Sequence, residues 1–89
     1  MTKCSLKIIN EKGLHARASA KLVEVVEGFD AQAEVSRDGL SASGDSIMGL
    51  LMLAASKGTT IDVRTSGPDA EALAHALTAL VADRFGEGF

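Results

Sequence analysis

The residues Gly13-Leu14-His15-Ala16-Arg17 place a histidine and an arginine between a turn-forming glycine and the start of a helical pattern. The imidazole of His15 is therefore expected at a helix N-terminus, where unpaired backbone N–H groups favour negative charge. Histidine can act as a nucleophile at neutral pH, and Arg17 adds a positive charge nearby. These residues predict a phosphoryl group bonded to His15 and held by Arg17 and by the backbone N–H groups of Ala16 and Arg17.

The predicted site binds a phosphoryl group with modest strength, which suits a protein that passes the group on better than one that retains it. A phosphoryl group carries about −1.5 to −2 charges. A helix N-terminus contributes about 0.3–1 kcal/mol per exposed anion, and one arginine at roughly 4 Å adds on the order of 1–4 kcal/mol. The chain has no P-loop and no Gly-rich dinucleotide loop, so no cofactor is expected and the phosphoryl group must come from another protein.

Other chemistry at His15 fits the sequence less well. The second histidine, His75, belongs to the polar face of a distant helix, and no carboxylate cluster flanks His15, so no metal site is predicted. No Ser/His/Asp spacing indicates a hydrolytic triad. On physical grounds alone, a merely solvated histidine beside a turn stays open as the alternative.

Ser46 is the second candidate, because it ends the break Ser43-Gly44-Asp45-Ser46 directly before a short helix over about residues 47–53. One reading is an ordinary helix cap. The other is regulatory phosphorylation at a helix N-terminus, which would place negative charge beside the apolar residues that follow.

That short helix is apolar nearly all round, although a small protein can bury only one side of it. Leu50, Leu53 and Ala54 form one group, and a second group contains Ile47, Met48 and Leu51. One group should be exposed. We predict that Ile47, Met48 and Leu51 dock a partner, with core packing as the alternative.

Composition limits the remaining functions. The 89 residues predict one domain, residues 1–89, and the net charge of −3 with no Tyr or Trp disfavours nucleic acid as a partner. The one cysteine, Cys4, is expected in the core and agrees with a reducing compartment. No apolar run is long enough for membrane insertion, and the N-terminus carries no signal run, so a cytoplasmic monomer is expected.

Hydrophobic periodicity predicts the order β-α-β-β-α-β-α. Four strands with one polar face, and three helices able to cover the other, make a two-layer α/β (α+β) open-faced sandwich. Arg37-Asp38-Gly39-Leu40 is expected to form a tight hairpin. The C-terminal residues 86–89 are expected to fray. The buried face of the first helix, Ala16–Glu27, is predicted to comprise Ala16, Ala20, Leu22, Val23 and Val26.

Two motifs, Gly-Leu-His-Ala-Arg at 13–17 and Ser-Ile-Met-Gly-Leu at 46–50, resemble those of HPr, the histidine-containing phosphocarrier family of the bacterial phosphoenolpyruvate-dependent phosphotransferase system. The resemblance implies that enzyme I phosphorylates His15 on Nδ1 and that the group passes to an enzyme IIA. It implies that an HPr kinase/phosphorylase modifies Ser46 in some bacteria, and that Ile47, Met48 and Leu51 form the docking patch. It also implies an antiparallel sheet in the order 1-4-2-3 with three helices on one face.

The chain departs from the family pattern in two places. Ala18 stands where the family usually has proline, and Glu24, Glu27 and Gly49 make the surface less basic than in enteric members that serve sugar transport. These departures favour the nitrogen-related regulatory branch or a system that lacks sugar transport. A regulatory protein-binding module and a purely non-covalent anion-binding domain are the competing hypotheses.

Overall fold

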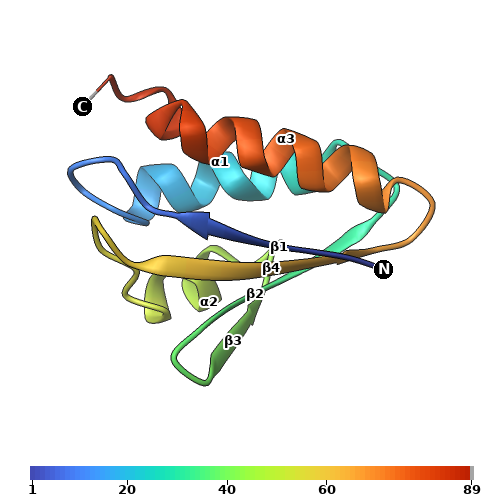
Figure 1. Cartoon of the computed structure of the whole chain (residues 1–89), viewed down its shortest axis with the longest axis horizontal. Helices are drawn as coiled ribbons and strands as arrows, with labels where there is room; N and C mark the ends of the chain where they lie inside the picture. The colour runs from blue at the N-terminus through green and yellow to red at the C-terminus, as the bar shows by residue number, and fades with distance from the viewer. Residues whose placement is uncertain (89) are drawn as a thin grey trace.

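The computed structural model describes residues 1–88. Within this range the order of elements is the predicted one, with a short 3-10 turn added at the end (Figure 1). The strands are β1 (Thr2–Lys7), β2 (Gln32–Arg37), β3 (Leu40–Ser43) and β4 (Thr60–Ser66). The helices are α1 (Ala16–Glu27), α2 (Ile47–Met52) and α3 (Ala70–Ala82), followed by the 3-10 turn η1 (Arg84–Gly86).

The sheet is antiparallel with strand order β1-β4-β2-β3, which confirms the order implied by the family resemblance. β4 lies inside the sheet, because Val63 pairs with Cys4 of β1 on one side and with Val35 of β2 on the other. The β2–β3 hairpin has the predicted two-residue turn, in which Asp38 and Gly39 both adopt positive φ angles, 50° and 81°.

One face of the sheet is covered and the other is open, as predicted. Figure 1 shows α1 and α3 side by side over the sheet, and α2 packs against α1 and β3. Strand alternation separates the faces: Ile61 and Val63 are buried, whereas Asp62 and Arg64 point outward. The core also contains fully buried side chains from α1, α3 and η1, namely Leu22, Leu73, Leu77 and Phe85.

The buried stripe of α1 differs from the predicted one. It consists of Ala18, Ser19, Leu22, Val23 and Val26. The prediction was wrong for Ala16, which is exposed, and for Ala20, which is only half-buried, because the stripe begins at Ala18 and the preceding Leu14 is itself buried. A serine is tolerated inside because the Ser19 hydroxyl donates to the Leu14 carbonyl at 3.3 Å.

The C-terminal tail is ordered against α1, so the prediction of fraying was wrong for Gly86 and Glu87. Phe85 is fully buried and acts as an anchor, and Lys21 Nζ donates to the Phe85 carbonyl at 2.7 Å. Positive φ angles at Phe85 (54°) and Gly86 (75°) turn the chain back toward the start of α1. Phe89, the last residue of the predicted frayed segment, lies outside the described residues.

Candidate functional site

His15 is the N-cap of α1, with extended backbone angles (φ −78°, ψ −176°) and a side chain that makes no capping bond. The preceding loop is pinned to the segment after α2, because Leu14 N donates to the Ala55 carbonyl at 2.8 Å. Gly13 has φ +65°, and a Cβ atom there would lie 2.5 Å from that same carbonyl oxygen. The glycine therefore allows the approach that sets the position of His15, whose side chain stays 28% exposed.

The helix N-terminus lies at His15 as expected, and anion binding there stays a prediction. The first turn contains no acidic residue, and the first intrahelical bond runs from Ser19 N to the His15 carbonyl at 2.8 Å. Within residues 1–88, the backbone N–H groups of Ala16 and Arg17 have no hydrogen-bond acceptor, and the exposed Arg17 side chain makes no ion pair. The unpaired N–H groups are thus available to an anion, and no carboxylate among these residues neutralises the Arg17 guanidinium.

The structure adds Glu87, a carboxylate that the sequence did not reveal. Its Oε2 atom accepts a hydrogen bond from His15 Nε2, and its Oε1 atom accepts one from Asn10 Nδ2 at 2.9 Å. Asn10 is fully buried and also donates to the Gly13 carbonyl at 2.8 Å. In the described part of the chain, the other ring nitrogen of His15, Nδ1, has no hydrogen-bond partner.

The charge state of Glu87 follows from its surroundings. The side chain is only 4% exposed, and this loss of water would by itself raise the pKa of the carboxyl group. Hydrogen bonds from Asn10 and His15, together with the positive charges of His15 and Lys12, outweigh that effect and lower the pKa below its usual value of 4.5. Glu87 is therefore a carboxylate at neutral pH and can only accept hydrogen bonds.

Nothing local in the sequence indicates this contact, because 72 residues separate His15 from Glu87. The available signal is Phe85, one of two phenylalanines in a tail that is otherwise polar or glycine. Treating Phe85 as a core residue would have brought the tail onto the helical layer, and Glu87 with it.

Ser46 is the N-cap of α2, and its Oγ accepts a hydrogen bond from Gly49 N at 3.0 Å. This confirms the capping role, and phosphorylation stays a prediction. The side chain is partly exposed and is followed directly by the apolar surface of α2.

The predicted docking residues are at the surface. Ile47, Met48 and Leu51 are 42%, 72% and 36% exposed, whereas Leu50 and Leu53 are buried. Grouping Ala54 with the buried pair was wrong, because α2 ends at Met52 and Ala54, with φ 51°, turns outward. Leu40 and Met52 are also exposed.

The remaining candidates lie apart from His15. His75 is exposed on α3 as predicted, and Cys4 is partly buried and packs against the core, also as predicted. Over residues 1–88, no group of three or more His, Cys, Asp or Glu side chains is arranged to hold a metal ion. In the same range, every helix is too short or too polar to cross a bilayer.

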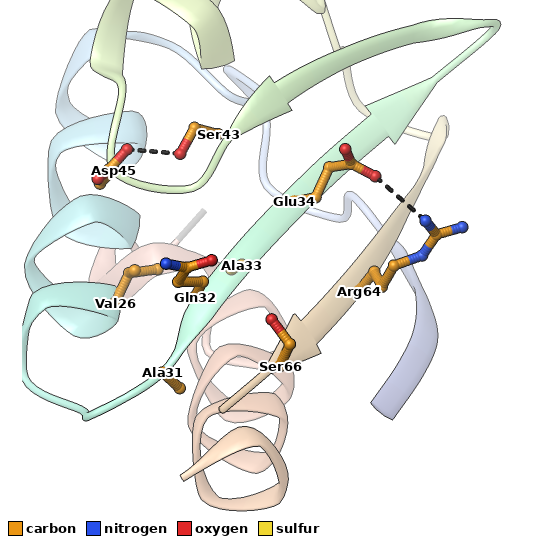
Figure 2. Close-up of a pocket in the computed structure, with 9 residues that line it drawn as sticks. All are labelled: Val26, Ala31, Gln32, Ala33, Glu34, Ser43, Asp45, Arg64 and Ser66. Atoms are coloured by element: carbon orange, nitrogen blue, oxygen red, sulfur yellow. Dashed lines mark hydrogen bonds and ion pairs between the residues drawn. The ribbon is translucent and has the colours of Figure 1, made fainter. Parts of the chain in front are cut away.

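A hollow lined by both polar and apolar side chains lies near the C-terminal end of α1 and the start of β2 (Figure 2). It contains the Arg64–Glu34 ion pair (3.6 Å) and the Ser43–Asp45 hydrogen bond (2.5 Å). Val26 on its wall lies eleven residues after His15, about 16 Å along the helix axis. None of the predicted site residues lines this hollow, so the candidate site is the exposed helix end rather than a cavity.

The chain is similar to phosphocarrier proteins in sequence. A family model described as the phosphorylation site of the PTS HPr component matches residues 2–83. The chain is 52% identical to phosphocarrier protein HPr of Cupriavidus necator over 81 residues, 91% of each chain. It is 41% identical to phosphocarrier protein NPr of Escherichia coli over 88 residues, 98% of this chain and 93% of the relative.

Solved structures agree with the sequence comparisons. HPr-C-His from Thermoanaerobacter tengcongensis superimposes with a TM-score of 0.94 at 34% identity, and the match covers 100% of both chains. HPr of Bacillus anthracis gives a TM-score of 0.85 at 34% identity over 90% of this chain and 95% of that one.

Proposed function

Because this chain belongs to the HPr family of phosphocarrier proteins of the phosphotransferase system, we propose that His15 is the residue that carries the phosphoryl group. The observation that supports this assignment most directly is the open N-terminus of α1. There His15 is an N-cap that leaves the N–H groups of Ala16 and Arg17 unpaired among the described residues. A dianionic group on the ring would meet these N–H groups and the Arg17 guanidinium.

In the proposed step, the lone pair of His15 Nδ1 attacks the phosphorus carried by phosphorylated enzyme I. A nitrogen–phosphorus bond forms, the bond between phosphorus and the donor breaks, and its electron pair leaves with the donor. The same exchange in the opposite sense passes the group to an enzyme IIA. The partly exposed ring and the modest strength of the anion site favour both directions of transfer.

The proposed docking surface for these partners is the exposed trio Ile47, Met48 and Leu51. Three large apolar side chains are exposed on the short helix α2, which supports the assignment. The segment that follows the helix lies close to His15, because the Ala55 carbonyl accepts a hydrogen bond from Leu14 N. Ser46, partly exposed at the start of this helix, is the proposed target of an HPr kinase/phosphorylase. A phosphate there would add negative charge beside the trio and weaken docking.

A second candidate function is that of a regulatory binding module in the nitrogen-related branch, uncoupled from sugar transport. The observation in its favour is the acidic outer side of α1, where Glu24 and Glu27 are both exposed. The relatives include proteins named HPr and NPr. In either branch the proposed form is a cytoplasmic monomer, because a single free cysteine suits a reducing compartment and His15 must stay accessible.

Intact mass spectrometry after incubation with phosphoenolpyruvate, Mg²⁺ and an active enzyme I tests the carrier function. The expected result is one added phosphoryl group that is lost in acid and kept in alkali. His15→Ala should abolish uptake, whereas His75→Ala, which alters an exposed histidine on α3, should leave it intact. Full uptake by His15→Ala would refute the assignment of His15.

A further inference from the structure

We propose that Glu87 is a positioning residue for phosphoryl transfer, which holds the His15 ring with its proton on Nε2 and its lone pair on Nδ1. This inference rests on the proposed function of His15 as phosphoacceptor. Its basis is the contact between Glu87 Oε2 and His15 Nε2, together with the hydrogen bonds that the buried Asn10 donates to Glu87 and to the Gly13 carbonyl.

Which group donates in each of these hydrogen bonds follows from the chemistry of the groups. The Gly13 carbonyl can only accept, so it fixes the Asn10 amide with Nδ2 toward it at 2.8 Å. The second N–H of the same nitrogen then donates to Glu87 Oε1 at 2.9 Å. The Glu87 carboxylate can only accept, so His15 Nε2 must supply the proton. Because a neutral imidazole carries one N–H group, Nδ1 is left with the lone pair that attacks phosphorus.

The Glu87 carboxylate also stabilises the His15 ring while the nitrogen–phosphorus bond forms. Bonding of phosphorus to Nδ1 places positive charge on the ring, the proton stays on Nε2, and its bond to Glu87 strengthens as that charge grows. The Glu87 carboxylate is shielded from water in this role, because its side chain is only 4% exposed. The tail that carries it is anchored by the buried Phe85 and by the bond from Lys21 Nζ to the Phe85 carbonyl (2.7 Å).

An isosteric substitution separates this role from simple packing. In Glu87→Gln, the side-chain oxygen is the only atom that can accept from Asn10, so the new amide N–H group faces His15. That group donates to Nε2, which must then hold the lone pair, and the ring proton moves to Nδ1. Glu87→Ala removes the partner altogether and leaves Nδ1 able to react. The proposal therefore predicts that the shape-conserving glutamine impairs transfer more than alanine does, whereas a packing role predicts the reverse.

The test combines a spectroscopic and a kinetic measurement on the full chain. Long-range ¹H–¹⁵N NMR of the unphosphorylated protein, above the pH at which the ring is protonated, reports which ring nitrogen of His15 carries the proton. We expect Nε2–H in the unmodified protein and Nδ1–H in Glu87→Gln. Single-turnover uptake from phosphorylated enzyme I should be on the order of tenfold slower for Glu87→Gln than for the unmodified protein, with Glu87→Ala in between. Glu71→Gln removes the same charge from an exposed site on α3 and should behave as the unmodified protein.

The outcomes distinguish this inference from the proposed function. An Nε2–H ring in Glu87→Gln, or uptake by that variant at least as fast as by Glu87→Ala, would overturn the role of Glu87 even with His15 phosphorylated as proposed. Conversely, uptake that survives His15→Ala would overturn the proposed function, whatever tautomer the NMR spectra show.

Discussion

Replacement of Gly13 by alanine tests how the fold sets the position of His15. Gly13 has φ +65°, and the added Cβ would lie 2.5 Å from the Ala55 carbonyl oxygen and 2.8 Å from Ser56 Cα. Both obstacles are backbone atoms, so no side chain can rotate away to make room. The loop must move, and the bond from Leu14 N to the Ala55 carbonyl must lengthen or break.

The size of the effect follows from three contributions. A left-handed conformation costs a residue with a Cβ roughly 1–2 kcal/mol. Overpacking against a fixed neighbour typically costs about 1–3 kcal/mol, and a lost hydrogen bond costs about 0.5–1.5 kcal/mol. We expect Gly13→Ala to lower the free energy of unfolding by about 3 kcal/mol or more. A domain of this size has about 4–13 kcal/mol in total, so a folded fraction should persist at low temperature.

Gly39→Ala is the matched control, because Gly39 also has a positive φ angle (81°) and its Cβ would meet nothing within 4 Å. It should cost only the conformational part, about 1–2 kcal/mol. Urea unfolding followed by circular dichroism measures both variants, and phosphoryl uptake should fall in Gly13→Ala alone. Equal losses of stability in the two variants would show that the contact with Ala55 does not constrain the His15 loop.

Three further predictions concern Ser46 and Glu87. Ser46→Ala should lower stability by about 0.5–2 kcal/mol through loss of the bond to Gly49 N. Ser46→Asp should keep the cap and raise the KM of enzyme I for this protein with little change in kcat; an unchanged KM would contradict the regulatory role. The lowered pKa of Glu87 means that the stability it adds is fully present above pH 4.5 and is lost as pH falls through the lower folded-state value. The difference in Tm between the unmodified protein and Glu87→Gln should therefore shrink below pH 4.5, and a constant difference would contradict the assignment.

Local sequence patterns predicted the parts of this fold that depend on near neighbours. The bounds of α1, the Asp38-Gly39 turn and the alternation along β4 follow from helical period, turn chemistry and strand period, which act within a few residues. Sheet order depends on pairings such as Cys4 with Val63, and periodicity contains no information about the partner strand. That order came only from the family resemblance.

In the candidate site, too, some features depend on near neighbours in the sequence and one does not. The open helix end at His15 and the exposed face of α2 could be predicted because each is built from consecutive residues. The Glu87 contact could not be predicted, because Glu87 lies 72 positions after His15 and is brought to it by the burial of Phe85. The error at Ala16 has a related cause: helical period gives the spacing of a buried stripe, and contacts with neighbouring elements decide at which residue it begins.

The N-cap of α1 shows how stability and function are balanced in this protein. Serine, threonine, aspartate or asparagine at position 15 would bond the first free N–H groups of the helix, and a cap without such a bond forgoes about 1 kcal/mol. His15 makes no such bond, and the loop is instead held by the bonds from Leu14 to Ala55 and from Asn10 to Gly13. These bonds offset the missing cap without occupying the helix end. The backbone N–H groups of Ala16 and Arg17 thus stay unpaired among the described residues, available to the phosphoryl group that we propose His15 carries.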